Sequence, residues 1–338
     1  PGRTFDVTRR DAFRGDRLDD FFRFVGERQR VWYRRVVLDD DPPWTSDEVL
    51  RRHRFTNVYR VLDPGTQYAI QAILDRDEPA PDRLFNVMLY RLVGRSATHA
   101  HVGFLPVEAF DVDEFERALA ARRDDGEPVF TGAYLVAGYS AFGGSDKVEN
   151  VARLFGEVAE RFDAFYASVE AASGPEAVYR AIRSLPGFGN FLAYQVLVDL
   201  LYPLPAHGGE SLLPFSPDEW AAAGPGAKRG LGRLLVESAD CSALEAMHWL
   251  RRNQAAEFDR LGIDFPWLRD DEGKRIELSL ADVQNYCCEF YKYQKVTTGE
   301  GQTRRRFRSE ERRSVAELRR LFEGNPVSVY SADYRQTS

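Results

Sequence analysis

Two carboxylates in the sequence each share a helical face with an amide side chain, a combination suited to proton transfer and to recognition of a base. Gln195 and Asp199 are spaced i, i+4 in an otherwise apolar stretch, so both side chains would lie on one face of a helix. Asn285 and Glu289 repeat that spacing, and Lys292 extends the same face. A carboxylate among apolar residues must be exposed, paired or functional. We therefore take Asp199 and Glu289 as candidate general bases, with capping or ion pairing as the alternatives.

A turn with two glycines precedes the helix that carries Asp199. Helical patterns at residues 175–185 and 190–202 flank the sequence Ser-Leu-Pro-Gly-Phe-Gly-Asn. We expect its glycines to allow a tight turn, and Asn190 to cap the second helix. Backbone amides at such a turn can bind a nucleic-acid phosphate without reading the base sequence. An ordinary helix–helix turn is the alternative. The candidate DNA-binding residues of this hairpin are Leu185, Gly187, Phe188 and Gly189.

A second glycine-rich segment, Gly-Pro-Gly-Ala-Lys-Arg-Gly, follows the hairpin and lacks the spacing of a P-loop. We expect a loop here, in which Gly224 and Gly226 admit a ligand close to the backbone. Lys228 and Arg229 would supply charge for a phosphate or pyrophosphate. Glu219, shortly before this segment, is a further candidate catalytic acid. A glycine-rich turn with solvated basic residues is the alternative.

Composition and periodicity indicate a mainly α fold. The chain has 338 residues, of which 43% are hydrophobic and 29% charged, and this is enough for a sizeable core. No segment alternates convincingly as a strand. We predict helices at 16–35, from 46, and at 66–74, 83–93, 110–123, 148–172, 175–185, 190–202 and 278–294, with the glycine-rich residues 129–144 least helical.

We expect three parts along the chain: an N-terminal helical extension (1–45), a helical catalytic core (46–310, with the hairpin at 175–202), and a C-terminal helix and tail (311–338). The net charge of -7 argues against a protein that coats DNA with its whole surface. Local basic clusters can still contact phosphates, although each could equally be a solvated face. The C-terminal cluster contains the candidate DNA-binding residues Arg304, Arg305 and Arg306.

Other features limit the compartment and the cofactors. The three cysteines form neither a plausible disulfide framework nor a zinc site. No apolar run reaches the roughly 20 residues of a membrane helix, and the polar, charged first ten residues are not typical of a secretory signal. We therefore expect a cytoplasmic monomer, in a bacterial or phage-infected cell, that needs no metal or cofactor and contacts no membrane.

Four sequence blocks together resemble one family. They are residues 54–63 with Gln67 and Tyr68; Thr-Gly-Ala-Tyr at 131–134 with Lys147; the hairpin with Gln195, Asp199 and the Gly-Pro-Gly segment; and residues 282–285 with 288–293. This combination resembles the α-glutamyl/putrescinyl thymine pyrophosphorylases and the helical domain associated with 5-hydroxymethyluracil DNA kinases, which are proteins of thymine hypermodification best known from phages. The hairpin is also similar to that of DNA glycosylases. The resemblance therefore implies a helix-hairpin-helix, DNA glycosylase-like helical fold.

The family implies an enzyme that replaces pyrophosphate on the 5-methylene of a uracil in DNA by an amine. Its partners would be modified DNA and a small amine or amino-acid co-substrate. The base would be flipped into a pocket, stacked on tyrosines and hydrogen-bonded by amides. Candidate catalytic residues are Asp199, Glu289, Lys292, Glu219 and Lys147. Candidate substrate-binding residues, besides the Gly-Pro-Gly segment, are Asn57, Tyr59, Arg60, Gln67, Tyr68, Gln195, Gln284 and Asn285.

Two other functions stay open. A DNA glycosylase would use an acid near Asp218 or Glu219 to assist cleavage of the bond between sugar and base. A non-catalytic module would only bind DNA. No kinase domain is evident, so phosphorylation by this chain is not expected. If the transferase hypothesis holds, Asp199 and Glu289 should face one cavity, lined also by residues 57–68 and by the Gly-Pro-Gly segment.

Overall fold

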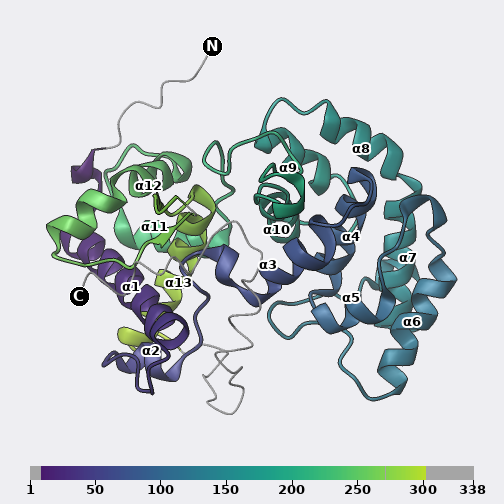
Figure 1. Cartoon of the computed structure of the whole chain (residues 1–338), viewed down its shortest axis with the longest axis horizontal. Helices are drawn as coiled ribbons and strands as arrows, with labels where there is room; N and C mark the ends of the chain where they lie inside the picture. Colours follow the sequence, from purple (N-terminus) through teal and green to yellow (C-terminus); the bar gives the residue numbers. More distant parts are fainter. Residues whose placement is uncertain (1–8, 271, 302–338) are drawn as a thin grey trace. The chain divides into compact units, whose positions relative to one another are not determined.

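The structure, a computed structural model, describes residues 9–270 and 272–301. Within these ranges it contains thirteen α-helices and one two-stranded antiparallel sheet, so the predicted mainly α class is confirmed (Figure 1). The chain forms two compact units: unit 1 takes Pro1–Asp63 and Trp220–Ser338, and unit 2 takes residues 64–219. The three-part division expected from the sequence stays a prediction. The candidates Arg304, Arg305 and Arg306 and the segment 311–338 lie outside the described residues.

Unit 1 combines an early and a late part of the described chain. In Figure 1 the purple helix α1 lies among the green and yellow helices α11, α12 and α13. Aromatic rings join α1 to α13, with ring centroids 4.5 Å apart for Phe24 and Tyr293 and 5.4 Å apart for Phe21 and Phe290. The elements of unit 1 are η1 (Arg10–Ala12), α1 (Gly15–Tyr33), η2 (Arg34–Leu38), α2 (Glu48–Arg52), η3 (Arg60–Leu62), α11 (Pro225–Leu234), α12 (Ala243–Arg260), β1 (Leu268–Arg269), β2 (Arg275–Ile276) and α13 (Leu280–Thr297).

The Gly-Pro-Gly segment begins helix α11, so the prediction of a glycine loop is wrong. Gly224 is the N-cap and Pro225 is the first helical residue, a position that suits proline because its missing N–H is not needed there. Gly226 and Gly230 lie one turn apart and face α13. A Cβ on the first would overlap the Cys288 sulfur, and one on the second the Cys287 carbonyl oxygen. These glycines therefore let two helices approach closely.

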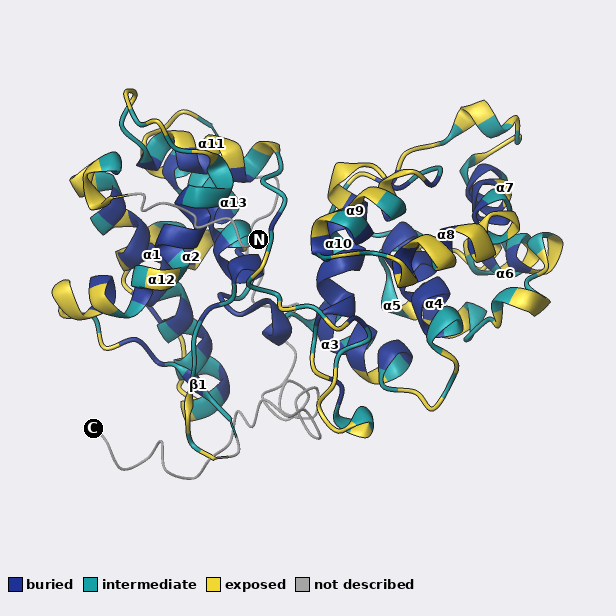
Figure 2. Ribbon diagram, turned by 90° about the horizontal axis from the view of Figure 1, so that it is seen from above, coloured by how far each residue is buried: buried dark blue, intermediate teal, exposed yellow. Residues whose placement is uncertain are grey.

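Unit 2 is an all-helical body whose centre is formed by α4 and α10. Both helices are dark blue along most of their length in Figure 2, because nearly every residue of α4 and most of α10 are buried. The elements are α3 (Pro64–Ala69), η4 (Ile70–Leu74), α4 (Ala80–Val93), α5 (Ser96–Val102), η5 (Val107–Ala109), α6 (Val112–Asp124), η6 (Ser140–Phe142), α7 (Lys147–Glu160), α8 (Phe162–Glu170), α9 (Pro175–Arg183), α10 (Asn190–Leu200) and η7 (Pro205–His207).

Most of the predicted helices are present, with differences at their ends. The single long helix expected at 148–172 is two helices, α7 and α8, which meet at Arg161. The helix expected from Ser46 begins at Glu48, because the Asp47 carboxylate accepts hydrogen bonds from two backbone amides and caps it. None of the helices in the described residues is both long and apolar enough to span a bilayer.

Candidate functional site

Residues 54–63 lie along helix α13 and are held there by hydrogen bonds centred on Thr56. The Thr56 amide donates to Glu289 Oε2 at 3.1 Å, and Asn285 Nδ2 donates to the Thr56 hydroxyl at 2.8 Å. The Tyr286 hydroxyl donates to the Thr56 carbonyl at 3.1 Å. We define the Thr56 cluster as residues 54–63 together with Asp282, Asn285, Tyr286, Glu289 and Lys292. The first and fourth sequence blocks therefore meet in space.

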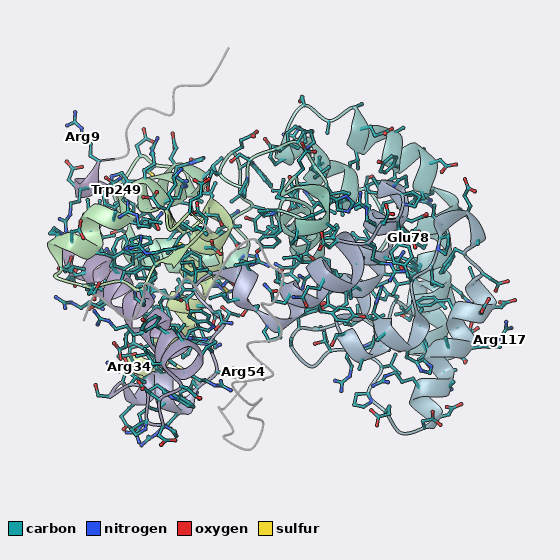
Figure 3. The ribbon with its side chains drawn as sticks, in the orientation of Figure 1. Arg9, Arg34, Arg54, Glu78, Arg117 and Trp249 are labelled. Carbon is teal, nitrogen blue, oxygen red and sulfur yellow. The ribbon has the colours of Figure 1, made fainter. Side chains whose placement is uncertain are left out.

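Glu289 is anchored through one carboxylate oxygen. Its Oε2 accepts from Thr56 and from Lys292 Nζ at 3.2 Å, while Oε1 has no hydrogen-bond partner among the described residues. Its side chain keeps 11% of its surface accessible. Lys292 also donates to the Arg54 carbonyl and lies 4.4 Å from the Phe55 ring centroid; the Arg54 side chain itself points away from the ribbon (Figure 3). A carboxylate held by one oxygen and accessible at the other has the geometry of a general base.

Asp63, which the sequence analysis did not select, is a second carboxylate in this cluster. Its Oδ1 accepts from the Asn57 amide at 3.0 Å, and the Asn57 side chain is itself held by Arg28 at 2.8 Å. Burial raises the pKa of Asp63 to about 6; the Asn57 hydrogen bond and the charges of Arg60 and Arg28 oppose this rise, and Glu289 adds to it. Two carboxylates with different surroundings can divide the roles of acid and base.

Three other sequence candidates in unit 1 have structural partners. Tyr59 is 2% exposed, and its hydroxyl donates to the Ile276 carbonyl at 2.7 Å, so its ring lies in the core and does not offer a stacking surface. Arg60 is buried, and its amide donates to Asp282 at 2.7 Å. Gln284 Nε2 donates to the carbonyl of Ala222 at 3.0 Å and ties α13 to the segment before α11. These hydrogen bonds are structural: they fix residues 59 and 60 and helix α13 against their neighbours.

The cations of α11 remain accessible, although Gly226 and Gly230 are packed against α13. Lys228 and Arg229 are exposed, and the Arg229 guanidinium lies 5.8 Å from the centroid of the Tyr291 ring. The Lys228 side chain has no ion-pair partner among the described residues. Gly226 is packed against Cys288, so the close backbone approach of a ligand expected at this residue is not possible. At Gly224, the N-cap of α11, an added Cβ would meet no atom within 4 Å, so the backbone is open to a ligand there, and α11 keeps this approach together with its two cations.

Comparisons with known proteins agree with the sequence blocks. A family model described as "5-hmdU DNA kinase, helical domain" matches residues 16–303. The chain belongs to this family. A 5-hmdU DNA kinase of Bacillus phage SP10 is 34% identical over 299 residues, which cover 84% of this chain and 46% of the relative, so the chain spans about half of that protein's length. No solved structure matches the chain. The resemblance to the helical domain of 5-hmdU DNA kinases is confirmed, and the glycosylase-like form of the fold stays a prediction.

In this member of the 5-hmdU DNA kinase helical-domain family, Asp199 belongs to the closed core of unit 2. Arg91 of α4 donates to both of its carboxylate oxygens, at 2.5 and 2.6 Å, and none of the Asp199 side chain is exposed. Tyr134 donates to the Arg91 carbonyl at 2.6 Å. With both oxygens occupied and no access, Asp199 lacks the geometry of the general base expected for it. It joins α10 to α4.

The hairpin consists of α9, the turn at residues 184–189, and α10. Leu185 and Phe188 are buried and hold the turn on the unit, so their side chains anchor the turn, and their contact with DNA stays a prediction. Gly187 has a φ of +79°, and an added Cβ would lie 2.8 Å from Leu154. Gly189, not Asn190, is the N-cap of α10, and it has no side-chain capping bond. The space around Gly189 is open.

The remaining candidates of unit 2 are dispersed over several elements. Gln67 is buried in α3, and Gln195 is half-buried. The Tyr68 hydroxyl is 2.9 Å from Nδ1 of His99, whose pKa burial lowers to about 4. Lys147 begins α7 and lies 4.3 Å from the Phe130 ring centroid. Glu219 is exposed and accepts from the Ser216 amide at 2.7 Å.

The sequence blocks therefore separate between the units. Unit 1 contains Asn57, Asn285, Glu289 and Lys292 in one cluster, with Lys228 and Arg229 on α11. Unit 2 contains the hairpin, Tyr134 and the Arg91–Asp199 pair. The predicted cavity shared by Asp199 and Glu289 joins residues of different units, and it stays a prediction.

Proposed function

We propose that this chain modifies a uracil base in DNA, replacing pyrophosphate on the 5-methylene group by an amine. The observation that carries the proposal is the match of residues 16–303 to the helical domain of 5-hmdU DNA kinases. The substrate named for the phage relative is a 5-hydroxymethylated uracil in DNA. A hydroxyl is a poor leaving group, whereas a pyrophosphorylated one leaves readily when cations stabilise its charge.

The reaction balances without a redox partner. The bond between the 5-methylene carbon and the pyrophosphate oxygen breaks, and its electrons leave with pyrophosphate. A bond forms between that carbon and the amine nitrogen, and the nitrogen loses one proton to a base. The products are a 5-aminomethyl-type uracil, pyrophosphate and a proton.

The Thr56 cluster supplies groups of the required types. We assign the general base to Glu289, whose Oε1 is accessible while Thr56 and Lys292 fix its other oxygen. Asp63, with its raised pKa, is a proton donor or acceptor near neutral pH. Asn285 keeps its side-chain oxygen for the edge of a flipped pyrimidine. Lys228 and Arg229 would stabilise the leaving pyrophosphate.

We assign DNA contact to the hairpin of unit 2, within a helix-hairpin-helix, glycosylase-like arrangement. The first amides of α10 have no side-chain cap, and the N-terminus of a helix attracts anions. Gly189 has open space around it and an ordinary φ of -69°, so glycine is not needed there for the turn. A DNA backbone that approaches closely would explain its presence.

The test is mass spectrometry of nucleosides after the chain is incubated with an amine donor and duplex DNA that contains 5-(pyrophosphomethyl)uracil. The expected result is an aminomethyl-type nucleoside together with free pyrophosphate. Abasic sites would indicate a glycosylase, and unchanged DNA would indicate a binding module. A parallel incubation of 5-hydroxymethyluracil DNA with ATP tests phosphorylation, the activity for which the phage relative is named. Phosphorylation in place of amine transfer would contradict the proposal.

A further inference from the structure

Leu135 is the most exposed large hydrophobic residue in the described part of the chain. It keeps 88% of its surface accessible, against 52% for Phe191 and 47% for Leu38. Single exposed leucines are common and need no explanation by themselves. The surroundings of Leu135, in the segment of residues 129–144 that we define as the Leu135 loop, therefore decide whether its exposure has a use.

The residues on both sides of Leu135 are fixed to unit 2. The Tyr134 hydroxyl donates to the Arg91 carbonyl at 2.6 Å. It reaches this carbonyl because Gly94 has no side chain: an added Cβ there would overlap the hydroxyl. Val136, on the other side, is only 3% exposed. With both neighbours turned inward, Leu135 is held outward by the fold.

The Leu135 loop lies against the hairpin. The Tyr134 and Phe191 rings meet edge to face, with centroids 5.2 Å apart, and the Tyr139 hydroxyl donates to the Gly187 carbonyl at 3.4 Å. Phe191 follows Gly189 by two residues, at the start of α10. The neighbour of Leu135 therefore contacts the second exposed apolar residue of unit 2, and the loop contacts the turn to which we assign DNA contact.

The surface around Leu135 is uncharged and low. Residues 128–145 and 184–198 contain no charged side chain, although 29% of the chain is charged. These two segments therefore have no carboxylate that would repel a phosphate backbone. The exposed residues within three positions of Leu135 are all small: Gly132, Ala133, Ala137 and Gly138. Leu135 thus protrudes from a surface that a nucleic acid can approach closely.

We propose that Leu135 is a wedge that enters the base stack of duplex DNA, with Phe191 beside it. An apolar side chain inserted at a base step partly unstacks it, which lowers the cost of extruding a neighbouring base. The wedge is itself stabilised, because its apolar surface leaves water. The proposal rests on the proposed function in taking DNA as the partner and an extruded uracil as the target.

A second copy of the chain fits this surface less well. A stable protein interface buries roughly 800 Å² on each partner around an apolar centre. Two exposed apolar side chains, one of them surrounded by glycine and alanine, do not supply such an area. A gap between base pairs needs only one or two apolar side chains to fill it.

The first test measures base unstacking by the whole chain without an amine donor. Two duplexes carry 2-aminopurine on both sides of the modified base, which is 5-hydroxymethyluracil in one and 5-(pyrophosphomethyl)uracil in the other. Saturating wild-type protein should raise the fluorescence, because unstacked 2-aminopurine is no longer quenched by its neighbours. Leu135→Ala should lose most of this rise and bind the duplex about tenfold more weakly. It should fold like the wild type, because the side chain is exposed. Leu38→Ala, which changes an exposed leucine of unit 1, is the matched control and should change neither quantity.

Turnover distinguishes a wedge from a general DNA contact. On duplex DNA with 5-(pyrophosphomethyl)uracil, Leu135→Ala should form the aminomethyl-type nucleoside about tenfold more slowly. On single-stranded DNA with the same base there is no base pair to open, so its rate should stay within about twofold of the wild type. Leu135→Met keeps a long apolar side chain and should restore turnover on the duplex.

Failure of the wedge and failure of the proposed function give different results. The wedge is overturned if the wild type binds the duplexes without a rise in fluorescence, if Leu135→Ala keeps the rise, or if this variant loses turnover equally on single-stranded and duplex DNA. Unstacking that depends on Leu135, with no aminomethyl-type nucleoside formed, leaves the wedge in place and contradicts the reaction. Transfer on duplex DNA at the wild-type rate by Leu135→Ala leaves the reaction in place and contradicts the wedge. A wild-type protein that binds neither duplex contradicts both.

Discussion

The polar core of unit 2 is closed, whereas the Thr56 cluster of unit 1 is partly open. In unit 2, Arg91 binds both oxygens of Asp199, and no part of that carboxylate is exposed. In unit 1, Glu289 uses one oxygen for its structural contacts and keeps 11% of its side chain accessible. Both carboxylates share a helical face with an amide residue, so the difference lies in their partners. Access, more than residue type, separates a carboxylate that holds the fold from one that can take a proton.

The largest effect is expected from Asp199→Ala. It leaves Arg91 charged and buried without its partner, which should lower the free energy of unfolding by about 3–5 kcal/mol. Chemical denaturation measures this, with Glu176→Ala as the control: Glu176 forms an exposed i, i+4 pair with Arg180, and its loss should cost less than about 0.5 kcal/mol. A stable Asp199→Ala protein with no turnover would reverse the comparison and make Asp199 a catalytic residue.

Glu289→Gln should act on turnover more than on stability. The amide preserves the shape and can still accept from Thr56, but it cannot take a proton from an amine. Turnover should fall by about 10²-fold or more, measured as the aminomethyl-type nucleoside formed per unit time. Glu300→Gln, which alters an exposed acid just beyond α13 that pairs with Arg233, should leave turnover close to that of the wild type. If both variants are equally active, Glu289 is not the base.

The packing of α13 against α11 can be tested with two glycines of one helix. Gly230→Ala places a methyl group against the Cys287 carbonyl oxygen, so the helices must separate, at a cost of about 1–3 kcal/mol. Gly232→Ala meets no atom within 4 Å and should stabilise the protein by up to about 1 kcal/mol, because alanine favours a helix. Similar denaturation midpoints for the two variants would contradict this account of the Gly-Pro-Gly segment.

Asp63 should make the stability of unit 1 depend on pH. Its pKa of about 6 in the folded protein lies above the ordinary value of 3.8, so folding favours its protonated form. The stabilisation that its protonated form gives to the folded protein is fully present below about pH 4 and is lost as the pH rises through about 6. Relative to Asp63→Asn, the free energy of unfolding of the wild type should fall by about 1–2 kcal/mol across that window; this figure is reduced for solvent screening because Asp63 is only half-buried. Denaturation at several pH values measures the difference, and parallel curves would contradict the raised pKa.

The sequence predicted most of the helices and the family, but it missed α5, α11 and α12 and did not indicate the environment of each side chain. The i, i+4 spacings of Asp199 and Glu289 placed each beside its amide, because that relation is local. The partner of Asp199 is Arg91, more than a hundred residues away, and no local pattern indicates it. The Gly-Pro-Gly segment was taken for a loop because glycine favours turns; only the neighbouring helix α13 shows why Gly226 and Gly230 lack side chains.

Asp63 was missed for a related reason. It closes the first sequence block directly before Pro64, a position typical of a turn residue, and turn aspartates are usually solvated. Its raised pKa comes from burial and from Glu289, which is distant in sequence. The available signal was its place at the end of a block in which Asn57, Tyr59 and Arg60 had already been selected. A tertiary contact was needed to distinguish Asp63 from an ordinary turn residue.

The smallest effect is expected in the hairpin, where two glycines differ in what they do. Gly187→Ala must adopt a left-handed φ and crowd Leu154, so it should lose about 1–2 kcal/mol of stability. Gly189→Ala meets no atom and keeps an ordinary φ, so its stability should fall only by what alanine loses to glycine as an N-cap, about 0.5–1 kcal/mol. If the DNA backbone approaches Gly189, the added methyl group should weaken duplex binding several-fold, by about 1 kcal/mol. Fluorescence anisotropy at one fixed salt concentration measures this, because phosphate contacts depend on salt. A Gly189→Ala protein that binds DNA as tightly as the wild type would reduce the hairpin to a turn, and DNA contact would then have to be sought elsewhere in the chain.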